Sequence, residues 1–326
     1  MRKMLKVYRT VEEQLLEIDE GDHLYEKGAW ICLINPTDEE LNRVSTHTGI
    51  NRDLLRHPLD DEERPRIEVD TGQILIIIKI PVTRQHGEAE FYDAIPLGII
   101  VTKDHLVTVC LDDNPLFQEL MHDSMLYTFM KTRFLLIVLI KTAALYLRYL
   151  RRLDKRSTEL QQRLSRSMRN EALLEMLEIQ KSLVYFTTSL RANGIVMEKL
   201  TRTQLINAEE APASMLIKMY PEDQDLLEDA ITENKQAIEM STIYSSILTG
   251  AMDAYASIIS NNLNAVMKFL TSVTIVLSLP TIVASIYGMN VALPFQHSPL
   301  AFAGIMGVTL GLCGMAAYAL ARWRMF

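Results

Sequence analysis

Acidic residues are missing from the C-terminal part of the sequence, because no Asp or Glu follows Asp253. All 41 carboxylates lie at or before this residue, and the 326-residue chain has a formal net charge of -8. The charged residues beyond it are Lys268, Arg322 and Arg324. Such an uneven distribution argues against a uniformly soluble chain and indicates two solvents, water for the first part and a lipid bilayer for the last.

Cysteine is also scarce. The three cysteines, Cys32, Cys110 and Cys313, show neither CxxC nor Cys/His spacing, so the sequence indicates neither a disulfide framework nor a zinc finger. It has no Walker A, GxGxxG or HExxH motif and no plausible catalytic triad. We therefore expect neither an enzyme nor an organic cofactor.

A secretory signal peptide is lacking as well. The opening segment MRKMLKVYRTVEEQ is basic, but charged residues interrupt it and no apolar stretch follows. We expect the bulk of the chain to stay in the cytoplasm.

Two long apolar runs lie near the C-terminus. Residues 269–287 (FLTSVTIVLSLPTIVASIY) carry no charge, and a helix of this length spans roughly 29 Å, the thickness of a bilayer core. Residues 299–321 are also uncharged and are rich in Gly and Ala, which let helices approach closely in lipid. We predict two transmembrane helices in the cell (inner or plasma) membrane.

Basic residues flank these two spans on one side only. Lys268 precedes the first span, the basic tail 322–326 follows the second, and the connecting loop 288–298 has no Lys or Arg. The positive-inside rule therefore places both the N- and the C-terminus in the cytoplasm and the loop outside.

A third apolar run, residues 134–147, carries Lys141 near its centre. A lysine at mid-bilayer depth costs about 2.5–3.5 kcal/mol or more. We therefore interpret this run as a buried helix of the soluble part rather than as a membrane span.

Glycine and proline become rare beyond Asn114 and Pro115, which form a good helix start. Residues 131–206 predict one or two very long helices, arranged as an antiparallel hairpin with its tip near residues 165–170. The basic run at 148–169 is interpreted as a solvated helical face, in preference to a membrane-surface or nucleic-acid patch.

A second helical stretch begins at Pro221. Gly250 is the single glycine before Pro280, and no proline intervenes, so one helix is predicted from Pro221 to about Tyr287. This helix would form a cytosolic stalk that enters the membrane without a break, and it needs helical partners to bury its own face.

The first 112 residues are typical of a mixed α/β domain. Thr37 followed by Glu40 is a capping box that opens a helix ending near Gly49. Strand-like stretches occupy residues 28–35, 66–82 with a turn at residues 71–72, and 96–111 with a turn at residues 103–104.

Hydroxyl residues form a stripe in the first predicted span. They recur at alternating intervals of three and four, a spacing that keeps one face toward the axis of a helical assembly. Small hydroxyl residues also serve simply to pack helices in lipid. Together with the stalk and an Asn at the outer end, however, the stripe predicts a polar, uncharged pore. Its predicted lining is Asn264, Met267, Leu270, Thr271, Thr274, Ser278, Thr281 and Ser285, of which Met267 and Leu270 would form an apolar constriction.

An uncharged pore suits Mg²⁺, which dehydrates reluctantly and keeps several of its waters. Neutral oxygens can hydrogen-bond to those waters without holding the ion too tightly to leave. Gly288, Met289 and Asn290 follow the first span directly, and we predict that they form the selectivity filter, with the Gly288 carbonyl and the Asn290 amide facing the ion.

These residues carry a resemblance to the CorA family of divalent-cation channels, whose signature is Tyr-Gly-Met-Asn at the end of the first of two C-terminal spans. Here it is Tyr287-Gly288-Met289-Asn290. DDEERPRIE at 60–68 and DAYASIISNNLNAVMKFLT at 253–271 are similar to further family segments. The resemblance covers the whole chain.

The resemblance implies an α+β cytoplasmic domain, long helices and two C-terminal transmembrane helices, assembled as a funnel-shaped homopentamer in the bilayer. It also implies a sensor for cytosolic Mg²⁺, with Asp229 and Asp253 at positions where the family carries regulatory carboxylates. The expected divisions are residues 1–112 (α/β domain), 113–220 (helical hairpin), 221–268 (stalk), 269–287 (pore helix), 288–298 (external loop), 299–321 (second span) and 322–326 (basic tail).

Three departures from the family pattern stand out. The outer loop has no Asp or Glu, whereas many family members carry an acidic residue there that would concentrate cations at the pore mouth. His297 in that loop is interpreted as a bystander. Pro280 is displaced by one position from the family's kink proline. Ser285 replaces a common glycine.

Alternatives remain open at this point. The main ion could be Co²⁺, Ni²⁺ or Zn²⁺, although the stripe offers no His or Cys to favour a softer cation. In a different class, the chain could be a membrane-anchored sensor whose spans serve only as an anchor. That reading leaves the hydroxyl stripe and Asn290 unexplained.

Overall fold

The fold is described from a computed structural model, which describes residues 5–12, 14–18, 26–70, 72–86, 89–166, 170–205, 216–291 and 300–323. The chain forms two compact units, Met1–Thr249 and Gly250–Phe326. Each is considered by itself. The finer division predicted from the sequence stays a prediction.

A seven-stranded sheet forms the base of the first unit, in the order β2-β1-β3-β7-β6-β5-β4. Only β3 and β7 pair in parallel among the described strands, and the remaining pairs are antiparallel. β3 and β7 are buried almost throughout, which explains their continuous apolar sequence. The bounds are β1 Leu5–Val11, β2 Gln14–Ile18, β3 Trp30–Ile34, β4 Arg66–Asp70, β5 Gln73–His86, β6 Ala89–Val101 and β7 Leu106–Cys110.

Short helices cover one face of this sheet. They are α1 (Asp38–Thr48), α2 (Arg52–Arg56) and the 3₁₀ helix η1 (His57–Leu59). Leu41 and Val44 of α1 join Ile31 and Val107 of the sheet in one apolar core. The predicted capping box is confirmed, and α1 ends in a left-handed glycine.

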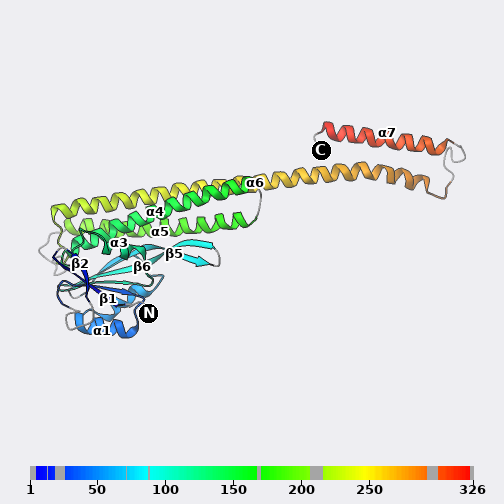
Figure 1. Ribbon diagram of the computed structural model, residues 1–326. Coiled ribbons are helices and arrows are strands. Elements are labelled where there is room, and N and C mark those ends of the chain that lie inside the picture. Colours follow the sequence, from blue (N-terminus) through cyan, green and yellow to red (C-terminus); the bar gives the residue numbers. More distant parts are fainter. Residues whose placement is uncertain are drawn as a thin grey trace. The chain divides into compact units, whose positions relative to one another are not determined.

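Longer helices cover the opposite face, where α4 (Lys131–Arg166) and α5 (Asn170–Leu205) lie along the sheet (Figure 1). They follow the short helix α3 (Pro115–Met121), which Asn114 caps as predicted. The predicted hairpin of two long helices is confirmed, and part of its tip, at residues 167–169, lies outside the described residues. Trp30 of β3 packs against Phe134 of α4, with ring centroids 5.0 Å apart.

The side chain of Asn193 in α5 hydrogen-bonds to the backbone of β5 at Lys79, where the neighbouring strand β4 has ended. β4 pairs with β5 only up to Ile77, so the outer backbone groups of Lys79 have no strand beside them. Asn193 Oδ1 accepts the Lys79 N–H at 2.8 Å, and its Nδ2 donates to the Lys79 carbonyl at 2.8 Å. The Tyr146 hydroxyl of α4 also donates to this carbonyl, at 3.1 Å, so two side chains satisfy the backbone groups of this edge.

Lys141 lies in the buried helix that its apolar neighbours predict. Its Nζ forms an ion pair of 2.8 Å with Asp123, which follows α3. The side chains flanking it in the run are largely buried in the first unit. The interpretation of residues 134–147 as part of a soluble core is therefore confirmed.

The long helix α6 spans Pro221–Tyr287, as predicted, and contains Pro280. Its first part packs in the first unit through a seam of buried leucine, alanine and polar residues. Asn234 Nδ2 donates to the Leu190 carbonyl of α5 at 3.0 Å, and Ser241 Oγ donates to the Leu183 carbonyl at 3.0 Å. The seam residues are Leu227, Ala230, Asn234, Ala237, Ser241 and Leu248.

The second unit contains the rest of α6 and α7 (Ala301–Arg322). Two helices of the described residues are long and apolar enough to cross a membrane, and they are these two. The span predicted at 299–321 corresponds to α7, while the predicted external loop falls largely on residues 292–299, outside the described residues.

The sequence reading missed the edge hairpin of β1 and β2. It also placed the strand at 28–35, whereas β3 covers Trp30–Ile34. Gly28, with φ +82°, turns the chain before the strand, and Asn35, with φ +47°, ends it.

Candidate pore face of α6

One face of α6 is covered in the second unit. Ser272 is fully buried, and Val276, Leu279 and Val283 are half-buried, at intervals of four, three and four. The thiol of Cys313 in α7 approaches the Val276 carbonyl, with an Sγ to O distance of 3.7 Å. This face is therefore the one that packs against α7.

The predicted pore residues lie on a different face of the same helix. At about 100° per residue, their mean direction is roughly opposite to that of the covered face. All of them are exposed: Asn264, Met267, Leu270, Thr271, Thr274, Ser278, Thr281 and Ser285. The structure thus brings the whole stripe together on one open face of α6.

Hydroxyl groups on this face donate to their own helix. Thr271 and Thr274 each donate to a carbonyl four residues back, at 2.8 Å, and Ser278 donates to the Ile275 carbonyl at 2.8 Å. Because the hydroxyl hydrogen is used in this way, the oxygen lone pairs are left to accept. A hydrated cation presents water hydrogens outward, so a row of acceptors matches its surface.

Two large apolar side chains occupy the same face of α6, on the N-terminal side of the hydroxyl residues. Met267 is 52% exposed and Leu270 is 55% exposed. They precede the hydroxyl stripe in α6.

The signature residues follow the end of α6 at Tyr287. The Gly288 N–H donates to the Ala284 carbonyl at 2.9 Å, and the chain then bends through Met289 and Asn290, which are both exposed. Gly288 has no positive φ, so its backbone is open to other residues. A Cβ at this position would lie 3.2 Å from the Ala284 carbonyl oxygen, so a larger residue here needs a shift of a few tenths of an ångström.

A model of the family described as CorA-like Mg²⁺ transporter protein matches residues 25–322. The chain belongs to the CorA family. It is 31% identical over 322 residues to the cobalt/magnesium transport protein CorA of Methanocaldococcus jannaschii, covering 96% of this chain and 95% of that protein. It is 24% identical over 285 residues to the protein of the same name from Thermotoga maritima, covering 83% and 74% of the two chains.

Solved structures agree with this assignment. The complete structure of the CorA magnesium transporter from Methanocaldococcus jannaschii matches with a TM-score of 0.79 and 27% identity, over 98% of both chains. The full-length CmaX protein matches with a TM-score of 0.66 at 13% identity, over 96% of this chain and 97% of that chain, and shows a shared fold. The CorA fold class is therefore established, and with it membership of a family of divalent-cation transporters.

The predicted regulatory carboxylates both lie on α6. Asp229 and Asp253 are exposed, and they belong to different units. Glu233, which the sequence reading missed, lies one helical turn beyond Asp229. Burial, and then the charge of Asp229, raise the pKa of Glu233 above its ordinary value. The Glu233 Oε2 atom is buried and has no hydrogen-bond partner among the described residues.

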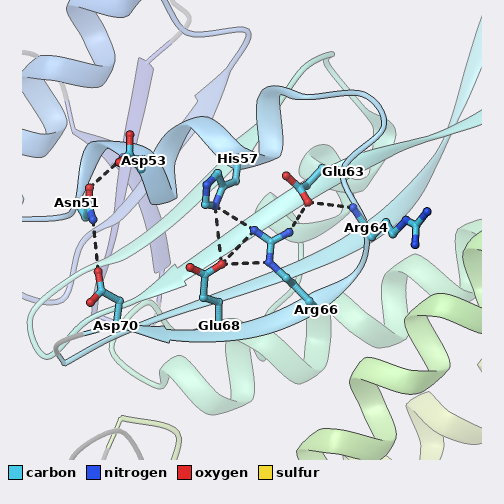
Figure 2. Close-up of polar contacts among 8 residues, drawn as sticks. All are labelled: Asn51, Asp53, His57, Glu63, Arg64, Arg66, Glu68 and Asp70. Carbon is cyan, nitrogen blue, oxygen red and sulfur yellow. Dashed lines mark hydrogen bonds and ion pairs between the residues drawn. The ribbon is translucent and has the colours of Figure 1, made fainter.

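The segment at 60–68 has a structural role in the first unit. Arg66 pairs with Glu63 and, at 3.0 Å, with Glu68, and its Nη2 lies 3.0 Å from His57 Nδ1 (Figure 2). These contacts hold η1, whose Pro58 packs so tightly on Gly98 of β6 that no Cβ would fit there. No cluster of three or more metal-binding side chains occurs in the described part of the chain.

Proposed function

We propose that this CorA-family chain is the protomer of a homopentameric divalent-cation channel that mainly conducts Mg²⁺. One observation supports this most strongly: the hydroxyl face of α6 is open and uncharged, while the opposite face packs on α7. Five copies of that face would enclose an axial path lined by neutral acceptors.

Ion selection in this proposal takes place at Gly288, Met289 and Asn290. A ring of Asn290 amides, with carbonyls of Gly288, contacts the water shell of the ion. Neutral ligands hold a dication more weakly than a carboxylate ring would, and the ion can leave again. Met267 and Leu270 form the constriction that closes the path when it loses water.

The topology follows from charge. Lys268 lies before the span of α6 and Arg322 ends α7, so both termini are cytoplasmic and the signature turn faces outside. An inside-negative potential contributes about 4.6 kcal/mol per 100 mV to the entry of a dication. Net influx is the expected direction.

Regulation by cytosolic Mg²⁺ involves Asp229 and Asp253. The repulsion between Asp229 and Glu233, with its unpartnered oxygen, is relieved when a cation binds nearby. Binding between protomers then favours a closed, symmetric state. Asp229→Lys should hold the subunits together by a salt bridge and blunt the dependence of closure on internal Mg²⁺. An unchanged response to internal Mg²⁺ would count against this site.

The test is Mg²⁺ uptake into dye-loaded liposomes that contain the purified protein, repeated with Co²⁺ and Ni²⁺. Asn290→Ala should abolish uptake, and Val291→Ala, an exposed neighbour in the same bend, is the matched control. Equal uptake by both variants would show that Asn290 does not form the selectivity filter.

The same assay distinguishes two alternatives. A faster flux of Co²⁺, Ni²⁺ or Zn²⁺ than of Mg²⁺ would show that the main ion is a different one, and the protein would still be a channel. Failure of every divalent ion to enter, with folded and pentameric protein at low internal Mg²⁺, would favour a membrane-anchored sensor.

A further inference from the structure

Pro280 interrupts the hydrogen-bond ladder of α6. Proline has no backbone N–H, so the carbonyl four residues earlier, that of Val276, loses its helical donor. In the hydrocarbon part of a bilayer no water replaces that donor, and an unsatisfied carbonyl is costly there. Some other group must satisfy the Val276 oxygen.

The thiol of Cys313 is in the right place to do so. Its Sγ lies 3.7 Å from the Val276 oxygen, a distance and geometry suited to an S–H donor. Cys313 is a residue of α7, and it faces α6 from the covered side, where both residues are partly buried. The one carbonyl that Pro280 releases is thus the one that α7 contacts with a donor.

We propose that Cys313 is a positioning residue that satisfies the proline break in α6 and fixes α7 to the pore helix at that level. The contact is an intramolecular one and stands without any transport activity. Its consequence for conduction rests on the proposed function. Pro280 lies between Ser278 and Thr281 of the open face, so a shift of the helix at this level would redirect both hydroxyls.

A double-mutant cycle isolates this contact. In the full-length protein, Cys313→Ala should lower the thermal midpoint by about 2–4 °C, whereas Cys313→Ser, which keeps a donor, should stay near the parent value. Pro280→Ala restores an N–H that can donate to Val276. In that background Cys313→Ala should have little further effect, and the volume lost at position 313 is the same in both arms.

Two results would overturn the proposal. One is an equal loss of stability from Cys313→Ala in both backgrounds, which would reduce Cys313 to a packing residue. The other is a Cys313→Ser variant as unstable as Cys313→Ala, and this comparison decides the question even if Pro280→Ala does not fold.

Flux through the same variants tests the consequence separately. Cys313→Ala should change the rate of Mg²⁺ uptake by about twofold or more, and Cys313→Ser should restore it. If the double-mutant cycle gives the expected stabilities but the protein conducts no ion, the contact is upheld and the proposed function is rejected. Failure of the contact and failure of the proposed function are therefore distinguishable.

Discussion

Thr271 and Ser272 are neighbours in α6, yet Ser272 is fully buried and Thr271 is exposed. Both are small hydroxyl residues that donate to carbonyls four residues back, at 2.8 and 2.9 Å. The residue type therefore does not explain their difference in burial. The face of the helix on which each lies explains it. The hydroxyl stripe that begins at Thr271 is left open by α7, and the proposed conduction along this face depends on that difference.

Loss of one hydroxyl on the open face should slow Mg²⁺ flux. Thr274→Val keeps the shape of the side chain but removes its acceptor, and five copies of the change line one ring of the proposed pore. At about 1 kcal/mol per lost hydrogen bond, we expect a decrease of about fivefold in liposome uptake. Thr309→Val is the control, because Thr309 also donates to a carbonyl four residues back, at 2.7 Å, but lies buried on α7. Similar decreases in both variants would contradict the assignment of faces.

The turn at Gly288 should tolerate little added volume. Gly288→Ala places a Cβ 3.2 Å from the Ala284 carbonyl, so the end of α6 must shift by a few tenths of an ångström. We expect uptake to fall while the protein still folds and assembles, and a larger loss for Gly288→Val. Gly250→Ala, at a position of α6 where a Cβ meets no atom within 4 Å, is the control. Normal uptake by Gly288→Val would show that this turn does not shape the filter.

Glu233 should make stability depend on pH. Its raised pKa means that the folded state favours the protonated carboxyl, so its favourable contribution is complete at low pH and is lost as the pH rises through the folded pKa. Glu233→Gln should therefore raise the thermal midpoint at neutral pH, and this gain should shrink toward about pH 4. The measurement is thermal unfolding of both proteins across this range. A gain that is constant with pH would reject the linkage.

Asn193 should be a strong determinant of stability in the first unit. Asn193→Ala leaves the Lys79 N–H without its side-chain acceptor, while the Lys79 carbonyl keeps the Tyr146 hydroxyl as a donor at 3.1 Å, so we expect a cost of about 1–3 kcal/mol. Asn193→Asp keeps an acceptor for the N–H, so its stability should lie between that of the parent protein and that of Asn193→Ala. Chemical unfolding of the full-length protein measures both. A cost for Asn193→Ala below about 0.5 kcal/mol would show that water satisfies this edge equally well.

Much of the architecture could be predicted because its signals are local. The capping box at Thr37, the start of α6 at Pro221 and the long uncharged spans each depend on a few adjacent residues. The heptad spacing of the hydroxyls predicted a shared face before any neighbour was known. Helical periodicity alone is enough for that.

Other features depend on residues that are distant in the sequence. Asn193 and Lys79 are matched by the three-dimensional fold, and no pattern near either residue signals the contact. The same holds for Cys313 and Val276, which lie on different helices. Glu233 was missed for a further reason: its charge is ordinary in sequence, and only burial beside Asp229 makes it unusual.

The face of α6 that conducts can be tested most directly by thiol labelling. Cys32 and Cys110 are buried, and burial raises the pKa of each to about 12, so a charged thiol reagent should leave them unmodified in a Cys313→Ser background. Single cysteines are then placed along the span of α6 and Mg²⁺ uptake is measured before and after treatment. If the hydroxyl face lines the pore, uptake should be blocked at Thr274→Cys, Ser278→Cys and Thr281→Cys, and not at Val276→Cys or Leu279→Cys. Block at the covered positions with none on the hydroxyl face would contradict this assignment of the pore.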